Sequence, residues 1–596
     1  MSNMSSSLGT MYTSARLAMA GALILLTSLH SSFVCASEPS ADLILYNGKV
    51  WTVDDGQPWA EAVAIRGNRI AQVGANREIL ALAGPATTRI DLGGKLVLPA
   101  FNDAHVHFEL ALDWYFQVRL VDVNSQEELA KRLAKMVKNM KPGIWITGGD
   151  WSTFDARRAA RAGVGVFQAF KPDLKAINAL TPNNPVLFRN YNHEYFANSA
   201  TFRIGKITKD TPNPPGGVYE KDPVTGELTG MLLGAAGQFV FALVPPVTLA
   251  QKRLGAIALQ RELHSMGIAS VADISRVDAI TQQRMEFANI ERAYSDLRIW
   301  EALKSHGELK LRVHPILPLS TLNQLASVGI RPGSGDAWIR YGTLKSFADS
   351  GMMLKPFVGH GLSGNWTFRF PGEDAIVAQI KEADAMGFNV GVHVIGDRAF
   401  QLVVEAFDKA SRDNPVRDRR HRMIHAWYAT PADLALAGKL RLFADVTPEH
   451  FVSGIEDMNR GLDSERAKTA HAWQSMIKNG MTVNIVSDLP GAYNKSSVAT
   501  VNPMENIFHA ITRKPTLAGQ SWHPEQALSV EQAIRAYTIN PARASGEERD
   551  KGSITPGKLA DLVVLSNDIV TGDPALLLRT RVLHTIVDGK TVYQSD

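Results

Sequence analysis

The sequence predicts an α/β protein in which a large barrel of parallel β/α units is accompanied by a small β-sandwich domain. Three observations lead to this fold class. The chain has 596 residues, which exceeds one average domain and suits a barrel with insertions. From about 98 to 545, apolar strand-like runs alternate with helical patterns, as parallel β/α units require. Both ends of the remaining chain carry short β-like segments instead.

Composition narrows the range of partners. Hydrophobic residues make up 45% of the chain, which is normal for a globular protein with a sizeable core, and the formal net charge is only +4. Lysines and arginines are interspersed with acidic residues, so nucleic acid is not expected as a partner. We expect a small-molecule substrate and leave the oligomeric state open.

The first 36 residues are expected to be a signal peptide. Arg16 precedes an apolar stretch over 17–29, which is too short for a comfortable membrane span, and Val34-Cys35-Ala36 forms a small-residue cleavage site. We therefore expect a secreted, periplasmic protein without a stable membrane span; an uncleaved anchor is the alternative. Cys35 is the only cysteine, so a metal site in the mature protein must use other ligands.

The two chain ends are predicted to build the β-sandwich domain together, from 37–97 and 546–596. Residues 42–50 and 62–74 alternate between apolar and polar side chains and turn at Asn-Gly and Gly-Asn pairs. The segments 560–565 and 585–593 have a similar β-like pattern.

The barrel is predicted to span 98–545. Its candidate strands outnumber those that a barrel needs: 96–107, 185–189, 267–273, 311–314, 341–347, 389–395, 422–425, 442–446 and 482–488. The segment from about 191 to 233 is rich in proline and glycine. It is interpreted as an insertion with a hairpin at 223–226.

Candidate metal ligands recur at the ends of these apolar runs. His105 and His107 are two residues apart, and residues i and i+2 of a strand share a face. Further runs contain or end in Lys345, His393, His425 and Asp488. Because catalytic groups of a β/α barrel converge at the carboxyl ends of its strands, these side chains together make a plausible site for two metals.

Each candidate has a plainer interpretation when it is taken alone. His393 and His425 could be hydrogen-bonded core histidines, and Asp488 could cap a helix. Lys345 is harder to explain away, since a lysine in an apolar strand is rarely buried unpaired. His450, His471 and His509 are weaker candidates, because none of them lies at the end of a predicted strand.

Several motifs resemble those of a known family. They are 99–107, 344–351, 393–399, 424–426, 486–490, 536–542 and 552–561. With them the chain resembles the amidohydrolase superfamily of metal-dependent hydrolases, in the branch that includes N-substituted formamide deformylases. The resemblance covers nearly the whole mature chain and implies a distorted (β/α)8 TIM barrel.

The resemblance also implies a ligand set for two divalent ions. His105 and His107 would bind one ion with Asp488 beside them, and His393 and His425 would bind the other. Zinc suits nitrogen and oxygen ligands, while manganese, cobalt and iron remain open.

Three roles beyond ligation come with the resemblance. Lys345 would carry a CO2-derived carbamate that bridges the ions, which is chemically sound because an apolar setting favours the neutral, reactive amine. Asp488 would also be the catalytic residue that moves a proton from water to the leaving nitrogen. His193 would contact the substrate.

The leading functional hypothesis is a secreted amidohydrolase that cleaves a non-peptide C–N bond, of amide or formamide type, with metal-activated hydroxide. An esterase, lactonase or cyclic-amide hydrolase is the alternative on the same site. A non-catalytic metal- or ligand-binding envelope protein is the alternative of another class.

Overall fold

The computed structural model describes residues 40–120, 123–138, 140–149, 151–152, 170–190, 194–275, 294–349, 373–490 and 501–595. The expected signal peptide and His193 lie outside these ranges. Among the helices that are described, none is both long and apolar enough to cross a bilayer.

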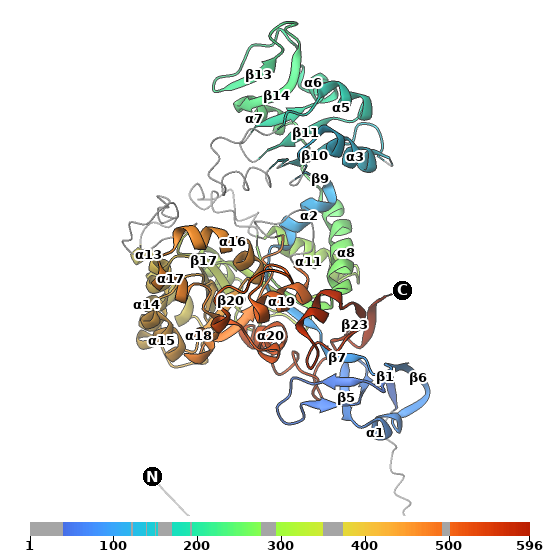
Figure 1. Cartoon of the computed structure of the whole chain (residues 1–596), viewed down its shortest axis with the longest axis vertical. Helices are drawn as coiled ribbons and strands as arrows, with labels where there is room; N and C mark the ends of the chain where they lie inside the picture. Colours follow the sequence, from blue (N-terminus) through green and yellow to red (C-terminus); the bar gives the residue numbers. More distant parts are fainter. Residues whose placement is uncertain are drawn as a thin grey trace, which may run out of the picture. The chain divides into compact units, whose positions relative to one another are not determined.

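Eight parallel strands form the barrel sheet (Figure 1). In chain order they are β8 (Phe101–Val106), β15 (Ile268–Ile274), β16 (Arg312–Pro318), β17 (Thr343–Phe347), β18 (Asn389–Val394), β19 (Arg422–His425), β20 (Phe443–Val446) and β21 (Thr482–Ile485). Each strand pairs with the next in parallel from β8 to β21. This confirms the predicted barrel; the ninth candidate, 185–189, belongs to another sheet.

The first and last barrel strands meet beyond the end of β21. The amide of Asp488 donates to the carbonyl of His105 over 3.0 Å, and the amide of His107 donates to the carbonyl of Leu489 over 2.7 Å. Val106 and Leu489 form an isolated parallel bridge. The closure is therefore made by the loop after β21, and it places Asp488 beside His105.

Helices accompany the barrel strands along the chain. They are α2 (Phe108–Phe116), α8 (Leu249–Ser265), α11 (Ser295–Ser305), α12 (Leu322–Ser327), α13 (Glu373–Ala385), α14 (Asp397–Asp413), α15 (Pro431–Lys439), α16 (Pro448–Gly461), α17 (Ser464–Thr469), α18 (Trp473–Lys478), α19 (Pro503–Thr512), α20 (Val530–Tyr537) and α21 (Ile539–Ala544), with short 3-10 turns at Leu319–Thr321, Pro524–Gln526 and Pro574–Arg579. In α14, Phe400, Val403 and Phe407 are buried at the three- to four-residue spacing of one helical face. These side chains join the barrel's main apolar core.

A second sheet interrupts the barrel between β8 and β15. Its strands are β9 (Gln117–Arg119), β10 (Ile146–Gly149), β11 (Val186–Arg189), β12 (Tyr195–Ala197), β13 (Gly217–Lys221) and β14 (Leu228–Gly234), with helices α3 (Gln126–Val137), α5 (Leu174–Leu180), α6 (Ser199–Gly205) and α7 (Ala235–Phe241). The expected insertion at 191–233 falls within this larger unit, which begins at Gln117. The hairpin expected at 223–226 is the turn between β13 and β14.

The chain ends build two further sheets. One contains β1 (Ala41–Tyr46), β4 (Ala62–Arg66), β5 (Arg69–Gly74) and β6 (Ala83–Asp91); the other contains β2 (Lys49–Trp51), β3 (Trp59–Ala60), β7 (Leu96–Pro99), β22 (Leu562–Leu565), β23 (Val582–Val587) and β24 (Lys590–Gln594). Helix α1 (Asn76–Leu80) contacts β1 and β4. Strand β7 pairs with β22, and one apolar cluster takes side chains from both sheets. The predicted two-ended β-domain is present.

Candidate metal centre

His105 and His107 lie at the carboxyl end of β8, and their Nε2 atoms are 3.4 Å apart. Two nitrogens bound to one tetrahedral zinc, each about 2.1 Å from it, lie about 3.4 Å from each other. Asp488 Oδ1 is 3.0 Å from the first nitrogen and 3.3 Å from the second. The three side chains therefore present donor atoms with the spacing that a single cation requires.

Asp488 is held in place by the barrel closure. Its backbone has φ of +57°, a left-handed conformation that favours glycine and that recurs at functional sites. The buried Asp103 accepts hydrogen bonds from the amides of His105 and Ser487 through the same oxygen, at 3.2 and 3.1 Å. This carboxylate thus ties the end of β8 to the residue before Asp488.

His393 and His425 lie on the neighbouring strands β18 and β19. Their ring centroids are 4.6 Å apart, and the ring of His425 is 5.3 Å from that of His105. One ligand atom each from His105, His425 and Asp488 fits within 4.8 Å of the others. His425 therefore lies between His393 and the β8 pair. It too has a left-handed backbone, with φ of +70°.

Lys345 lies on β17 and its side chain is buried. Burial lowers the pKa of Lys345 to about 7, although the negative charges of Asp488 and Asp445 work against that shift. The charge of Lys345 in turn lowers the pKa values of His105 and His393. The lysine is thus close to the histidines, and its amine is available in the neutral form near neutral pH.

The electrostatics favour neutral imidazoles around an ionised carboxylate. Burial lowers the pKa of His105 to about 3 and those of His393 and His425 well below the usual value. Burial alone would raise the pKa of Asp488, but electrostatic attraction to His105 and hydrogen bonds from His105 and His107 hold it well below its usual range. Neutral histidine and ionised aspartate are the forms that bind divalent metals.

Several polar atoms of the cluster have unmet bonding capacity. Within the described residues, His105 Nδ1, His393 Nε2 and His425 Nδ1 are buried without a hydrogen-bond partner. An unsatisfied buried polar atom costs about 1–3 kcal/mol, so such a group needs a further partner. A coordinated cation would supply such a partner. The donor set fits a metal.

Neighbouring groups orient the candidate ligands. His107 Nδ1 lies 3.1 Å from the carbonyl oxygen of Ile274, which directs its Nε2 atom toward Asp488. A metal-binding histidine usually makes such a bond with its second nitrogen. Asp349 Oδ1 lies 3.6 Å from His393 Nε2, and its two oxygens accept from the amides of Ile395 and Gly396.

The sequence-based reasoning missed His450. Its Nε2 atom lies 3.5 Å from Asp488 Oδ2, and its ring centroid is 5.5 Å from that of His425. His450 is in the first turn of α16, which begins two residues after the end of β20 at Val446. No strand ends at this histidine, as expected, but the helix that carries it places its ring beside Asp488. The Thr447-Pro448 pair, which marks a helix start directly after an apolar run, was the signal available.

A parallel β/α barrel with histidine and carboxylate donors gathered at the carboxyl ends of its strands defines a metal-dependent hydrolase. Residues 88–593 match the model of the amidohydrolase family. The chain belongs to this family, and its activity is hydrolysis of carbon–nitrogen bonds.

The chain is similar to other proteins over most of its length. It is 29% identical to protein LONG AFTER FAR-RED 3 of Arabidopsis thaliana, over 93% of this chain and 92% of that protein. It is 28% identical to an N-substituted formamide deformylase of Arthrobacter pascens, over 93% of this chain and 98% of that protein. A crystal structure of an uncharacterized metal-dependent hydrolase from Pyrococcus horikoshii shares the fold, with a TM-score of 0.65 and 21% sequence identity. The match covers 89% of this chain and 99% of that chain.

Proposed function

We propose that the chain hydrolyses a small, non-peptide amide of formamide type at a centre of two divalent ions. The observation that carries this proposal is the convergence of His105, His107 and Asp488 on one point, with the buried Lys345 nearby. His393 and His425 supply the donors for a second ion. Zinc matches the nitrogen and oxygen ligands, and a carbamate on Lys345 would give both ions an oxygen.

Bound divalent metal would supply Lewis-acid polarisation of the substrate carbonyl and a water of lowered pKa. Asp488 is the group suited to proton transfer. It is ionised, it lies within 3.3 Å of both β8 histidines, and His450 lies beside its second oxygen. A carboxylate in this position takes a proton from water and delivers it to the departing nitrogen. His193 is proposed to contact the substrate.

The formamide class is supported by the likeness to the Arthrobacter pascens deformylase along almost the whole of both chains. A formyl carbon carries no side group, so it makes small steric demands at a metal centre lined by imidazoles. We therefore expect N-substituted formamides to be turned over faster than N-acyl amino acids, cyclic amides or esters.

The test is a panel of these four substrate classes with the metal-loaded protein and two variants. Asp488→Asn keeps the size of the side chain and should lower kcat by about 10²–10⁴-fold on whichever substrate is best, because it removes the proton acceptor. Asp413→Asn, at an exposed position on α14, should leave kcat unchanged. Turnover of esters in preference to every amide would reject the substrate class, and full activity of Asp488→Asn would reject the proposed proton transfer.

We also propose that the protein is exported to the periplasm. The proposal is supported by Arg16, the apolar stretch at 17–29 and the Val34-Cys35-Ala36 site. N-terminal sequencing of protein from fractionated cells is the test. A mature chain that begins at Ser37 in the periplasmic fraction is expected, and a chain that retains residues 1–36 in the cytoplasm would overturn it.

A further inference from the structure

A cavity of about 630 Å³ lies far along the strands from the metal centre. His421, Phe443 and Thr482 line it, and they lie at the amino-terminal starts of β19, β20 and β21. The candidate metal ligands His425 and Asp488 lie at the carboxyl ends of this part of the barrel. The cavity is therefore at the opposite end of the barrel from the catalytic groups, and no step of the proposed hydrolysis uses it.

The lining of this cavity is rich in positive charge. It contains Arg417, Arg419, Arg420, Lys439, Arg441 and Arg543. The carboxylates in the lining are Asp418 and Glu548, and Asp384 pairs with two of the arginines. Six cations thus face three carboxylates, so three positive charges remain. Positive charges gathered in a cleft raise the local concentration of anions.

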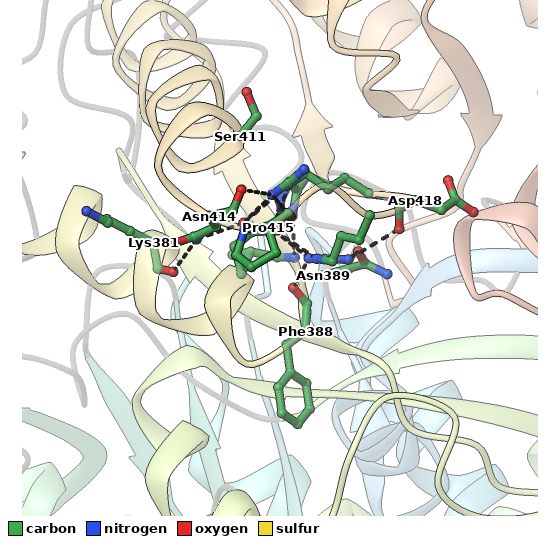
Figure 2. Close-up of polar contacts among 12 residues, drawn as sticks. Lys381, Phe388, Asn389, Ser411, Asn414, Pro415 and Asp418 are labelled. Carbon is green, nitrogen blue, oxygen red and sulfur yellow. Dashed lines mark hydrogen bonds and ion pairs between the residues drawn. The ribbon is translucent and has the colours of Figure 1, made fainter.

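One side of the cavity is held rigid by a polar network (Figure 2). Asp384 accepts from Arg417 Nη2 at 2.6 Å and from Arg419 Nε at 3.0 Å. Arg417 also donates to Asn389 Oδ1 and Arg419 to the carbonyl oxygen of Pro415. These guanidinium groups are therefore fixed in place, so an anion that binds near them does not have to order them.

Arg420 is fixed in the same way on the other side. Its Nη1 and Nη2 atoms bind the two oxygens of Glu548 at 2.6 and 2.7 Å, and Nη1 also donates to the carbonyl oxygen of Arg543. This pairing neutralises Arg420 and positions the start of the loop after α21 at the edge of the cavity.

The remaining cations have no carboxylate among the described residues in direct contact with them. Within the part of the chain that the structure describes, the side chains of Lys439, Arg441 and Arg543 make no hydrogen bond or ion pair. Arg441 has a left-handed backbone with φ of +53°, in the turn after α15 where glycine is the usual residue. The fold therefore places a large cation at a position where a small neutral residue would be easier to accommodate.

We propose that this cavity binds a small molecule that carries a phosphate group. A phosphate dianion matches the uncompensated charge better than a monocarboxylate, and arginine and lysine are the side chains that recognise phosphate most effectively. Leu440 and Phe443 give the cavity an apolar wall beside the cations. That wall suits the organic part of a phosphate ester.

Isothermal titration of the metal-loaded protein with inorganic phosphate and with phenyl phosphate tests this site. Both anions should bind, and phenyl phosphate should bind more tightly because its ring can contact the apolar wall. The Lys439→Gln, Arg441→Gln double variant should weaken both affinities about 10- to 100-fold, since charge-assisted hydrogen bonds are removed. Glutamine keeps a side chain with a Cβ at the left-handed position, so the backbone cost there changes little.

A control variant, Arg579→Gln with Lys590→Gln, removes the same number of positive charges from the C-terminal segment, at residues that do not line the cavity. It should bind both anions as the unmodified protein does. Equal affinities in the two double variants would overturn the proposal, because binding would then reflect net charge or the metal centre. Absence of binding to the unmodified protein at millimolar phosphate would overturn it as well. Hydrolytic activity is not part of the readout, so failure here leaves the proposed hydrolase function standing.

Discussion

A buried lysine, Lys345, distinguishes this cluster from an ordinary group of buried histidines. A buried lysine without a counter-charge would be costly, and here burial brings its pKa to about 7. Conversion of its neutral amine to a carbamate would replace an unfavourable buried ammonium with an anionic ligand that bridges two metals. Substitution of Lys345 therefore tests the proposed metal centre most easily.

Substitution of Lys345 by alanine should lower kcat/KM by at least about 100-fold and reduce the bound metal, since a shared ligand is lost. Steady-state kinetics and elemental analysis of the same preparation would measure both effects. Lys310→Ala, at an exposed position just before β16, is the matched control and should change neither. Unchanged metal content and activity in Lys345→Ala would show that the lysine is not a ligand.

At this scale the sequence predicted most of the cluster. His105, His107, Lys345, His393, His425 and Asp488 were recognised because each lies within or just after an apolar run, and the structure brings them together. His450 was missed because it follows its strand by several residues and enters the cluster from a helix. The number of residues between a histidine and the end of a strand does not show whether the first turn of the next helix points that histidine back toward the barrel.

At the scale of elements, Asp384 on α13 joins this helix to the segment that leads into β19. Its side chain is fully buried and accepts from Arg417, Arg419 and Asn414, with His421 at 3.2 Å. Burial alone would raise the pKa of Asp384, but the hydrogen bonds from His421, Arg419 and Asn414 outweigh it and hold the pKa well below its usual range. One carboxylate thus fixes the start of a strand that ends at the metal centre.

Asp384→Asn should lower the free energy of unfolding by about 3 kcal/mol at neutral pH, because it leaves buried cations without their partner. The folded-state pKa of Asp384 lies below its unfolded value of about 3.9, so its stabilisation is present above that pH and is lost as the pH falls through the folded value. Urea denaturation should therefore show the gap between variant and unmodified protein narrowing below about pH 4. A gap that stays constant with pH would contradict this assignment. Asp210→Asn, at an exposed position after α6, is the control.

The elements themselves were predicted unevenly. All eight barrel strands were found because parallel strands buried on both faces form continuous apolar runs. The second sheet was only partly anticipated. Its strands β9 and β12 have three residues each, which is too short for a periodic pattern to be recognised. Pairing with sequence-distant neighbours, such as β9 with β10, decides their conformation.

At the scale of the whole molecule, a buried ion cluster joins the two-ended β-domain to the barrel. Arg312, on β16, binds Asp561 through Nε at 2.6 Å and Nη2 at 2.9 Å, and its Nη2 also lies 3.1 Å from Asp588. The cluster explains how residues near the C-terminus can stabilise a strand in the middle of the barrel.

Asp561→Asn should therefore lower the free energy of unfolding by about 3 kcal/mol, since the buried guanidinium loses its bidentate partner. Chemical denaturation followed by tryptophan fluorescence would measure the change. Asp210→Asn, at an exposed position after α6, should have almost no effect. If both variants were equally stable, the cluster would have no role in attaching the domain.

We expect side chains that are far apart in the sequence to hold divalent metal jointly at the carboxyl ends of the barrel strands. Anomalous diffraction from crystals of the active protein, recorded at the absorption edges of zinc, iron, cobalt and manganese, tests it most directly. We expect one peak between His105, His107 and Asp488 and a second beside Lys345, His393 and His425. Active protein with no anomalous peak among these side chains would contradict it.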